Sequence, residues 1–393
     1  MRGQGPIGIV GGGAWGTALA NVAASAGHDA ILWLRDSALA KSLATERMNA
    51  RFLPGVPLAA GIHPTTDLSD LSGVRCVLLV TPAQTTRQLA SDLAAVLADE
   101  APLVICAKGF ERDSNAFLSA VVAAARPLAP VAVLSGPSFA ADVARGLPTA
   151  VTLAARDPAL SAELAALLSG PTFRVYHRSD VRGVEIGGAA KNVLAIACGA
   201  VAGKGLGESA KAALVARGFA ELLRFAQAYG GEAETLMGLS GLGDLVLTCA
   251  SAQSRNFAFG ERLGRGMPVS DAAGGALVEG AFTAKALVAL ARARHVEMPV
   301  DAIIRHVGDA VLEPADRDLA GAEIGVLDPG RLPEPMDASR LLGPESVGIL
   351  DRGLVFCLIS RLIEIGAAAP IGRNVVDLLV HGASPRPCDS RLP

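Results

Sequence analysis

The first half of the chain alternates short apolar runs with amphipathic stretches, and this alternation predicts strands joined by helices. Two of the helical stretches span residues 88–98 and 115–125. Strands that alternate with helices are typical of a doubly wound, mainly parallel α/β sheet. The predicted strands are residues 6–10, 30–34, 76–80, 103–106, 131–134, 148–155 and 172–177.

The apolar spacing becomes helical at Val181 and stays so, which predicts an all-helical second domain. Residues 217–229, 257–263 and 283–294 are the clearest helices. We predict that residues 238–248, which are apolar and rich in glycine, form a loop between the first two.

The last part of the chain has a different composition. Residues 328–344 are rich in proline, glycine and charge and predict a linker, and residues 354–380 predict one or two helices. We therefore expect three parts, and the last has no functional interpretation. They are an α/β domain (1–180), an all-helical domain (181–320) and a C-terminal extension (321–393).

A glycine-rich turn, Gly-x-Gly-x-x-Gly, lies between the first predicted strand and the first helix. Gly11 permits a tight turn, Gly13 lets the backbone approach a pyrophosphate, and Gly16 lets the helix pack against the sheet. A tight turn without a ligand can show the same pattern. The strand–turn–helix setting favours a dinucleotide.

Arg35 and Asp36 follow the second predicted strand. A carboxylate there suits the ribose hydroxyls of NAD, whereas an arginine suits the 2′-phosphate of NADP. Arg35 favours NADP and Asp36 leaves NAD open. The alternative is a surface charge pair after a strand.

Ligands of doubly wound sheets bind beyond the carboxyl ends of the strands, where several polar groups occur. Lys108 directly follows a buried strand, which favours a ligand for an anion or a carbonyl. The stretch 135–140 offers backbone N–H groups and a hydroxyl at the same edge, although a proline-containing turn would also explain it.

Lys191 stands among small and apolar residues. Burying its charge unpaired would be costly, so the ammonium either reaches water or faces a partner. A desolvated lysine is a common general acid or base, and Asp244, the one charge in the stretch 238–248, is the obvious partner. Residues 254–256, Ser-Arg-Asn before a helix, favour a phosphate site, with a capping serine and a surface arginine as the alternative.

Composition narrows the class of protein. Apolar residues make up 51% of the 393 residues, which excludes global disorder, and a net charge of -3 argues against a general nucleic-acid binder. Six scattered cysteines fit a reducing compartment better than a disulfide framework or a zinc site. We expect a cytoplasmic protein, because neither a signal peptide nor an uncharged membrane-spanning run is evident.

These motifs resemble those of the bacterial NAD(P)-dependent glycerol-3-phosphate dehydrogenases, over about residues 5–312. Many long motifs in the family's order make the resemblance specific. The matching stretches are 11–20, 107–109, 135–140, 187–196, 241–249, 254–256 and 278–280.

The resemblance implies a Rossmann domain followed by an all-α domain of the 6-phosphogluconate-dehydrogenase-like type. It implies reversible hydride transfer between dihydroxyacetone phosphate and sn-glycerol 3-phosphate, for phospholipid synthesis, with Lys191 as acid/base beside Asp244. No metal or nucleic acid is implied, and a homodimer is left open. The implied substrate-binding residues are Lys108, Gly136, Ser138, Ser254, Arg255 and Asn256. The implied NAD(P)-binding residues are Gly11, Gly13, Ala14, Trp15, Gly16, Arg35, Lys108, Ala140, Arg255, Leu277 and Glu279.

The chain departs from the family in two places. The stretch 281–284, Ala-Phe-Thr-Ala, stands where the family usually has polar residues, and some 80 residues follow the region of resemblance. Two rival functions remain. One is another 3-hydroxyacid or phosphosugar dehydrogenase of the same plan. The other is a non-catalytic NADP sensor, which would need neither Lys191 nor Asp244.

Overall fold

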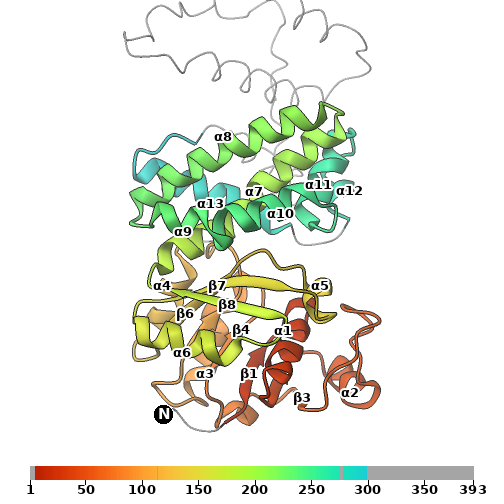
Figure 1. Ribbon diagram of the computed structural model, residues 1–393, viewed down its shortest axis with the longest axis vertical. Helices are drawn as coiled ribbons and strands as arrows, with labels where there is room; N and C mark the ends of the chain where they lie inside the picture. Colours follow the sequence, from red (N-terminus) through yellow and green to blue (C-terminus); the bar gives the residue numbers. More distant parts are fainter. Residues whose placement is uncertain (1–4, 113, 275–277, 299–393) are drawn as a thin grey trace, which may run out of the picture. The chain divides into compact units, whose positions relative to one another are not determined.

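The computed structural model describes residues 5–112, 114–274 and 278–298 (Figure 1). The predicted linker, the predicted helices of 354–380 and the whole extension 321–393 lie outside these residues, as does Leu277. The division of the chain into three domains stays a prediction.

An eight-stranded sheet, in the order β3-β2-β1-β4-β5-β6-β7-β8, forms the first half of the described chain. All neighbouring strands are parallel except β6 and β7, which confirms the predicted mainly parallel sheet. The strands are β1 (Ile7–Val10), β2 (Ala30–Trp33), β3 (Ile62–Thr65), β4 (Val77–Leu79), β5 (Leu103–Ile105), β6 (Val131–Ser135), β7 (Thr149–Ala155) and β8 (Phe173–Arg178).

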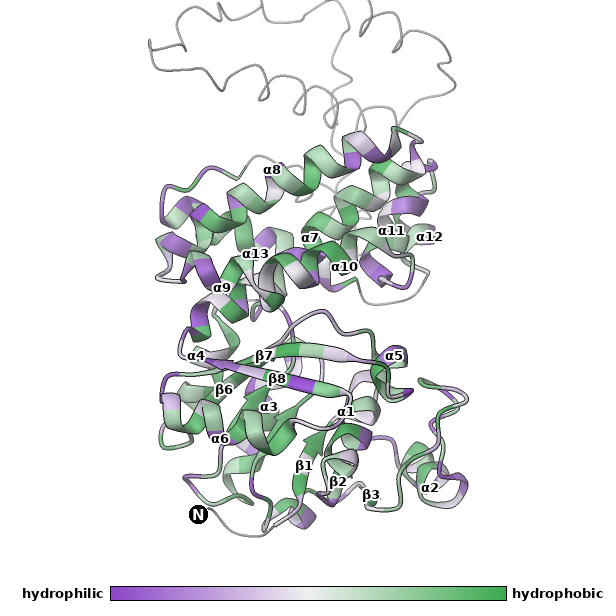
Figure 2. Ribbon diagram, in the orientation of Figure 1, coloured by the Kyte–Doolittle hydropathy of each residue, from purple (hydrophilic) through white to green (hydrophobic). Residues whose placement is uncertain are grey.

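Strand β3 was not predicted, because it contains Pro64 and an exposed histidine, His63, in place of an apolar run. Proline has no N–H to donate and is tolerated in a strand at the edge of a sheet, where β3 lies. The opposite edge strand, β8, alternates buried and exposed residues, and Figure 2 shows hydrophilic stretches along it.

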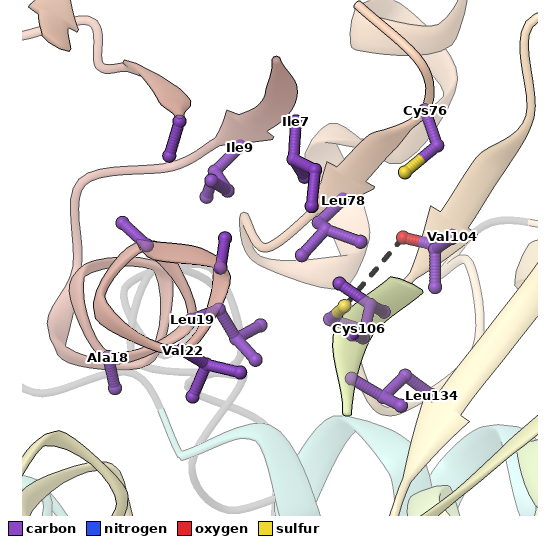
Figure 3. Close-up of a cluster of buried hydrophobic side chains, with 14 of the residues drawn as sticks. Ile7, Ile9, Ala18, Leu19, Val22, Cys76, Leu78, Val104, Cys106 and Leu134 are labelled. Atoms are coloured by element: carbon purple, nitrogen blue, oxygen red, sulfur yellow. Dashed lines mark hydrogen bonds between the residues drawn. The ribbon is translucent and has the colours of Figure 1, made fainter. Parts of the chain in front are cut away.

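Helices cover the sheet and bury its apolar side chains. Successive residues of β1 point to opposite faces, so Ile7 and Ile9 join one core cluster and Val10 the other. Figure 3 shows Ile9 in one cluster with Leu19 and Val22 of the first helix. The helices of this half are α1 (Ala14–Ser25), α2 (Ser37–Glu46), α3 (Thr86–Ala94), α4 (Leu118–Ala125), α5 (Ala140–Ala144) and α6 (Pro158–Leu168), with the 3₁₀ turns η1 (Leu68–Leu71) and η2 (Ala83–Thr85).

Cysteines in the described part of the chain are free and buried. Cys76 and Cys106 belong to the core cluster drawn in Figure 3, and burial raises the pKa of the Cys76 thiol to about 12. Such thiols stay protonated at neutral pH and act as small apolar side chains.

The second half is helical, as the spacing predicts. Its central helix, α7, packs against α8, α10, α11 and α13. By length and composition α7 could cross a membrane, but 83% of its apolar window is buried inside the protein, as in a core helix. The elements are α7 (Val181–Gly203), α8 (Gly207–Ala228), α9 (Ala233–Met237), the π-helical turn η3 (Leu239–Gly243), α10 (Asp244–Ala250), α11 (Arg255–Gly264), α12 (Val269–Ala273) and α13 (Glu279–Ala293).

The predicted loop at 238–248 is wrong, because η3 and α10 occupy it. Gly241 is there for close packing rather than for flexibility. A Cβ on Gly241 would lie 1.9 Å from the carbonyl oxygen of Leu236. The glycines that indicated a loop therefore let a π-helical turn pack tightly.

Helices α7 and α11 meet backbone to backbone. A Cβ on Gly199 would lie 2.0 Å from the carbonyl oxygen of Phe257, and one on Gly260 would lie 2.0 Å from that of Ile196. The same holds one turn farther along, at Gly203. The contact therefore has no room for a side chain, and it fixes the distance between the two helices.

Candidate active site

The glycine-rich turn shows three different uses of glycine. Gly11 has φ +127°, which few other residues adopt, and a Cβ on Gly16 would lie 1.8 Å from the carbonyl oxygen of Gly11. A Cβ on Gly13 would meet nothing within 4 Å. Packing therefore does not require glycine at position 13, and the open space lies at the N-terminus of α1. This arrangement fits a pyrophosphate.

Asn49 holds this turn in place, and sequence reasoning missed it. Its buried side chain donates to the carbonyl oxygen of Gly12 at 3.0 Å and to Thr17 Oγ1 at 2.8 Å. No pattern in the sequence links a residue after α2 with the turn before α1. Ala14 and Trp15 begin α1 directly after the turn.

Arg35 and Asp36 lie just after β2, and both are exposed. Asp36 Oδ1 accepts a hydrogen bond from the backbone N–H of Leu39 at 3.0 Å and so caps α2. The Arg35 side chain has no hydrogen bond or ion pair with another described residue, so it is available to a ligand.

Lys191, Asp244 and Lys108 form one buried ion cluster. Lys191, from the middle of α7, donates to Asp244 Oδ1, which confirms the predicted pair. Lys108, from the loop after β5, donates to Asp244 Oδ2 at 2.6 Å. Asp244 is 0% exposed, and each of its carboxylate oxygens accepts a hydrogen bond from a lysine. The buried carboxylate is therefore fully paired.

Burial lowers the pKa of Lys191 to about 7, while the Asp244 carboxylate opposes this shift and the Lys108 ammonium adds to it. A general acid or base works best when its pKa lies near the working pH. The cluster therefore gives Lys191 the proton affinity that such a group needs.

Small residues around Lys191 let two other segments approach α7. A Cβ on Gly187 would lie 2.5 Å from the carbonyl oxygen of Ser240 in η3, and one on Gly188 would lie 2.7 Å from Ser135 Oγ. Backbone and protein side chains, rather than a ligand, therefore explain the small residues at these two positions.

The stretch after β6 lies at the same edge of the sheet as Lys108. Gly136 has φ +154°, and a Cβ there would lie 2.8 Å from Val151 Cα. Ser138 Oγ donates to the carbonyl oxygen of Gly136 at 3.0 Å, and Ala140 begins α5. The hydroxyl of Ser135 is buried with no hydrogen-bond partner among the described residues.

Residues 254–256 begin α11. Ser254 Oγ accepts from the backbone N–H of Phe257 at 3.2 Å, which is the helix cap considered as its alternative role. Asn256 Oδ1 accepts from the backbone N–H of Gly280 at 3.1 Å and ties α11 to α13. Arg255 is exposed at the helix N-terminus.

Glu279 and the departure at 281–284 line one cavity with Lys108. Burial raises the pKa of Glu279, and the cations of Arg255 and Lys108 oppose this shift. Phe282, in the departure, lines the cavity together with the loop after β5, and its ring centre lies 3.8 Å from the guanidinium carbon of Arg112 in that loop. The departure thus adds an aromatic contact between α13 and that loop.

Glu185, six residues before Lys191 on α7, has a role that no local sequence pattern indicates. Its Oε1 accepts from the backbone N–H of Ser119 at 2.7 Å, and its Oε2 accepts from Ser119 Oγ at 2.7 Å and from Arg182 at 3.1 Å. Ser119 lies in the first turn of α4, which has no side-chain cap of its own. Glu185 therefore caps α4 from α7.

This combination defines a class of protein. A dinucleotide turn on a mainly parallel sheet, joined to helices that bury a lysine with a pKa near neutrality, is typical of a two-domain NAD(P)-dependent dehydrogenase.

Comparison with known protein families agrees with this class. The description "NAD-dependent glycerol-3-phosphate dehydrogenase N-terminus" matches residues 6–161, and the description of its C-terminus matches residues 180–316. The chain belongs to the NAD-dependent glycerol-3-phosphate dehydrogenase family and is an NAD(P)-dependent oxidoreductase.

The matches with individual relatives span nearly the whole length of each relative. The glycerol-3-phosphate dehydrogenase [NAD(P)+] of Methylobacterium radiotolerans is 64% identical over 305 residues, which are 77% of this chain and 92% of the relative. That of Azorhizobium caulinodans is 61% identical over 306 residues, 78% of this chain and 92% of the relative. The crystal structure of the Coxiella burnetii glycerol-3-phosphate dehydrogenase has a TM-score of 0.74 at 39% identity, covering 78% of this chain and 98% of that one.

Proposed function

We propose that this chain interconverts dihydroxyacetone phosphate and sn-glycerol 3-phosphate with NAD(P) and so supplies glycerol phosphate for phospholipid synthesis. The observation that carries the proposal is the buried pairing of Lys191 with Asp244, which Lys108 joins from the loop after β5. The names of the relatives supply the substrate.

Lys191 is the proton-transfer group of this mechanism. In the direction of reduction, the Lys191 ammonium donates its proton to the oxygen of the C2 carbonyl, and in oxidation the neutral amine takes the proton of the C2 hydroxyl. Asp244 holds the amine in place and opposes the loss of its proton. When bound, the nicotinamide supplies or accepts the hydride at C2.

The phosphate of the substrate is assigned to the N-terminus of α11 and to the edge of the sheet. Arg255 offers an exposed guanidinium there, Asn256 offers an amide N–H₂ group, and Ser254 keeps its hydroxyl proton while it caps the helix. Lys108, Gly136 and Ser138, in the loops after β5 and β6, are assigned to the same phosphate. Holding the phosphate fixes C2 relative to Lys191.

The cofactor is assigned to the open space at Gly13, where an added Cβ would meet nothing. Gly11, Gly16, Ala14 and Trp15 shape the turn, and Arg35, Ala140 and Glu279 complete the assigned cofactor contacts. We assign Leu277 from the family pattern alone.

The test is oxidation of NADH or NADPH, followed at 340 nm, with dihydroxyacetone phosphate as substrate. We expect turnover with dihydroxyacetone phosphate. In the direction of oxidation, with NAD+ or NADP+, we expect little activity on 6-phosphogluconate or 3-hydroxyisobutyrate. Well-folded protein without activity on dihydroxyacetone phosphate would reject the proposal.

We also propose that the enzyme is cytoplasmic, does not span a membrane and acts as a homodimer. Cell fractionation would test the location, and size-exclusion chromatography with light scattering would test the homodimer.

A further inference from the structure

We propose that Arg51 is a determinant of NADP recognition in this chain, because it neutralises Asp36 and joins Arg35 in a site for the 2′-phosphate. The inference rests on the proposed function, since it concerns the cofactor of that reaction. An NAD site directs a carboxylate at the ribose hydroxyls, and Asp36 holds the corresponding position here.

Both carboxylate oxygens of Asp36 already have donors within the protein. Oδ1 accepts from the backbone N–H of Leu39 at 3.0 Å, and Oδ2 accepts from Arg51 Nη1 at 3.2 Å. A ribose hydroxyl would have to compete with these donors. The charge of the carboxylate is also offset by the guanidinium beside it.

The segment that carries Arg51 is tied to the glycine-rich turn by Asn49. The buried side chain of Asn49 bonds to Gly12 and Thr17, and its Oδ1 accepts from the backbone N–H of Phe52 at 3.2 Å. The guanidinium carbon of Arg51 lies 4.9 Å from the centre of the Phe52 ring. The segment that carries Arg51 is thus fixed to the turn at the start of α1.

The resulting charge favours a phosphate over a hydroxyl. Arg35 and Arg51 carry two positive charges against the single negative charge of Asp36. The Arg51 side chain is 65% exposed, and its planar guanidinium keeps N–H donors beyond the one that contacts Asp36. Without Arg51 the excess positive charge would vanish, and Asp36 would repel the phosphate.

The experiment measures nucleotide binding apart from turnover. Adenosine 2′,5′-bisphosphate and adenosine 5′-monophosphate are titrated into the full chain, and binding is followed by the fluorescence of its two tryptophans, Trp15 and Trp33. We expect Arg51→Ala to raise the Kd of the bisphosphate about tenfold, as the loss of a charged phosphate contact does, and to leave that of the monophosphate within about twofold.

Two further variants distinguish a local effect of Arg51 on Asp36 from the general effect of losing a surface arginine. Asp36→Asn in the Arg51→Ala background removes the repulsion while keeping a capping side chain, so we expect part of the bisphosphate affinity to return. Arg265→Ala removes an arginine of similar exposure, 66%, that pairs with Glu261 on α11, and should change neither Kd.

Three outcomes would overturn the inference. They are equal changes for the two nucleotides in Arg51→Ala, no recovery on adding Asp36→Asn, and the same shift in Arg265→Ala. The proposed function is tested separately, by the turnover of the wild-type chain with NADH and dihydroxyacetone phosphate. If the wild-type chain reduces no dihydroxyacetone phosphate, the proposed function fails while the titrations still test Arg51.

Discussion

Lys108 and Lys191 donate to opposite oxygens of the same buried carboxylate, that of Asp244. One lysine comes from the sheet half and the other from the middle of α7, so a single carboxylate joins the two halves of the described chain at the proposed site of proton transfer. Two cations around one anion leave an excess positive charge in a buried place. Burial of the ammonium lowers the pKa of Lys191, the Asp244 carboxylate opposes this shift, and the second cation, Lys108, adds to it.

Lys191→Met tests the proton-transfer role directly. The change keeps the length of the side chain and removes the charge and the proton, so kcat should fall by about 10²–10⁴. Binding of NADH, followed by tryptophan fluorescence, should hardly change because the glycine-rich turn is untouched. A variant within about tenfold of the wild-type kcat would show that Lys191 is only a packed helix residue.

Asp244→Asn should shift the pH dependence of turnover. The Asp244 charge opposes the lowering of the Lys191 pKa, so its removal should bring that pKa below about 7. Reduction needs protonated Lys191 and is lost as the pH rises through this pKa, so the loss should begin at lower pH in the variant. Oxidation needs the neutral amine, and its rise with pH should likewise begin lower. An unchanged profile of kcat against pH would contradict this coupling.

The Asp244→Asn loss in kcat should be smaller than that of Lys191→Met, because the lysine itself remains. The double variant should lose less than the two single losses combined, since the two residues act as a unit. Fully additive losses in single-turnover rates would show that the pair does not work together.

Gly13→Ala separates folding from cofactor binding. Gly13 has φ -74°, which alanine adopts freely, and the added methyl meets no protein atom within 4 Å. The Tm should therefore stay near that of the wild type, while the KM for NADPH should rise by about tenfold or more because the methyl lies where the pyrophosphate is assigned. Gly16→Ala is the contrasting control, since its methyl would overlap the carbonyl oxygen of Gly11 and should lower the Tm.

Glu185→Ala should destabilise the protein although the residue contacts no proposed ligand. The change removes three hydrogen bonds and leaves the N-terminus of α4 uncapped, so the free energy of unfolding should fall by roughly 2–4 kcal/mol. Urea unfolding measures this change. Ser119→Ala removes only the hydroxyl bond and should cost about 1 kcal/mol. Equal stabilities of wild type and Glu185→Ala would refute the capping role.

Local patterns in the sequence predicted most of the sheet and the central site pair. Val10, Leu78 and Val104 lie in short apolar runs between helical stretches, so the strands that contain them are evident from the sequence. Lys191 and Asp244 could be paired because each is the one charge in an apolar stretch, and an isolated charge needs a partner.

The rest depends on contacts that no local pattern carries. Lys108 reaches Asp244 across 136 positions, and Glu185 caps a helix 66 positions away, so only the fold brings these groups together. The η3–α10 segment was misread because glycine serves loops and close packing equally. Likewise α8 begins at Gly207, ten residues before its predicted start, since its first turns carry no distinctive apolar face.

The glycines between α7 and α11 have a consequence for what the enzyme can accept. Lys191 belongs to α7 and the proposed phosphate groups, Arg255 and Asn256, to α11. A methyl at Gly199 or Gly260 would push the helices apart and lengthen the span between the proton donor and the phosphate anchor. Two residues outside the proposed site thus set the length of substrate that fits, and larger residues at these positions would favour longer phosphorylated substrates.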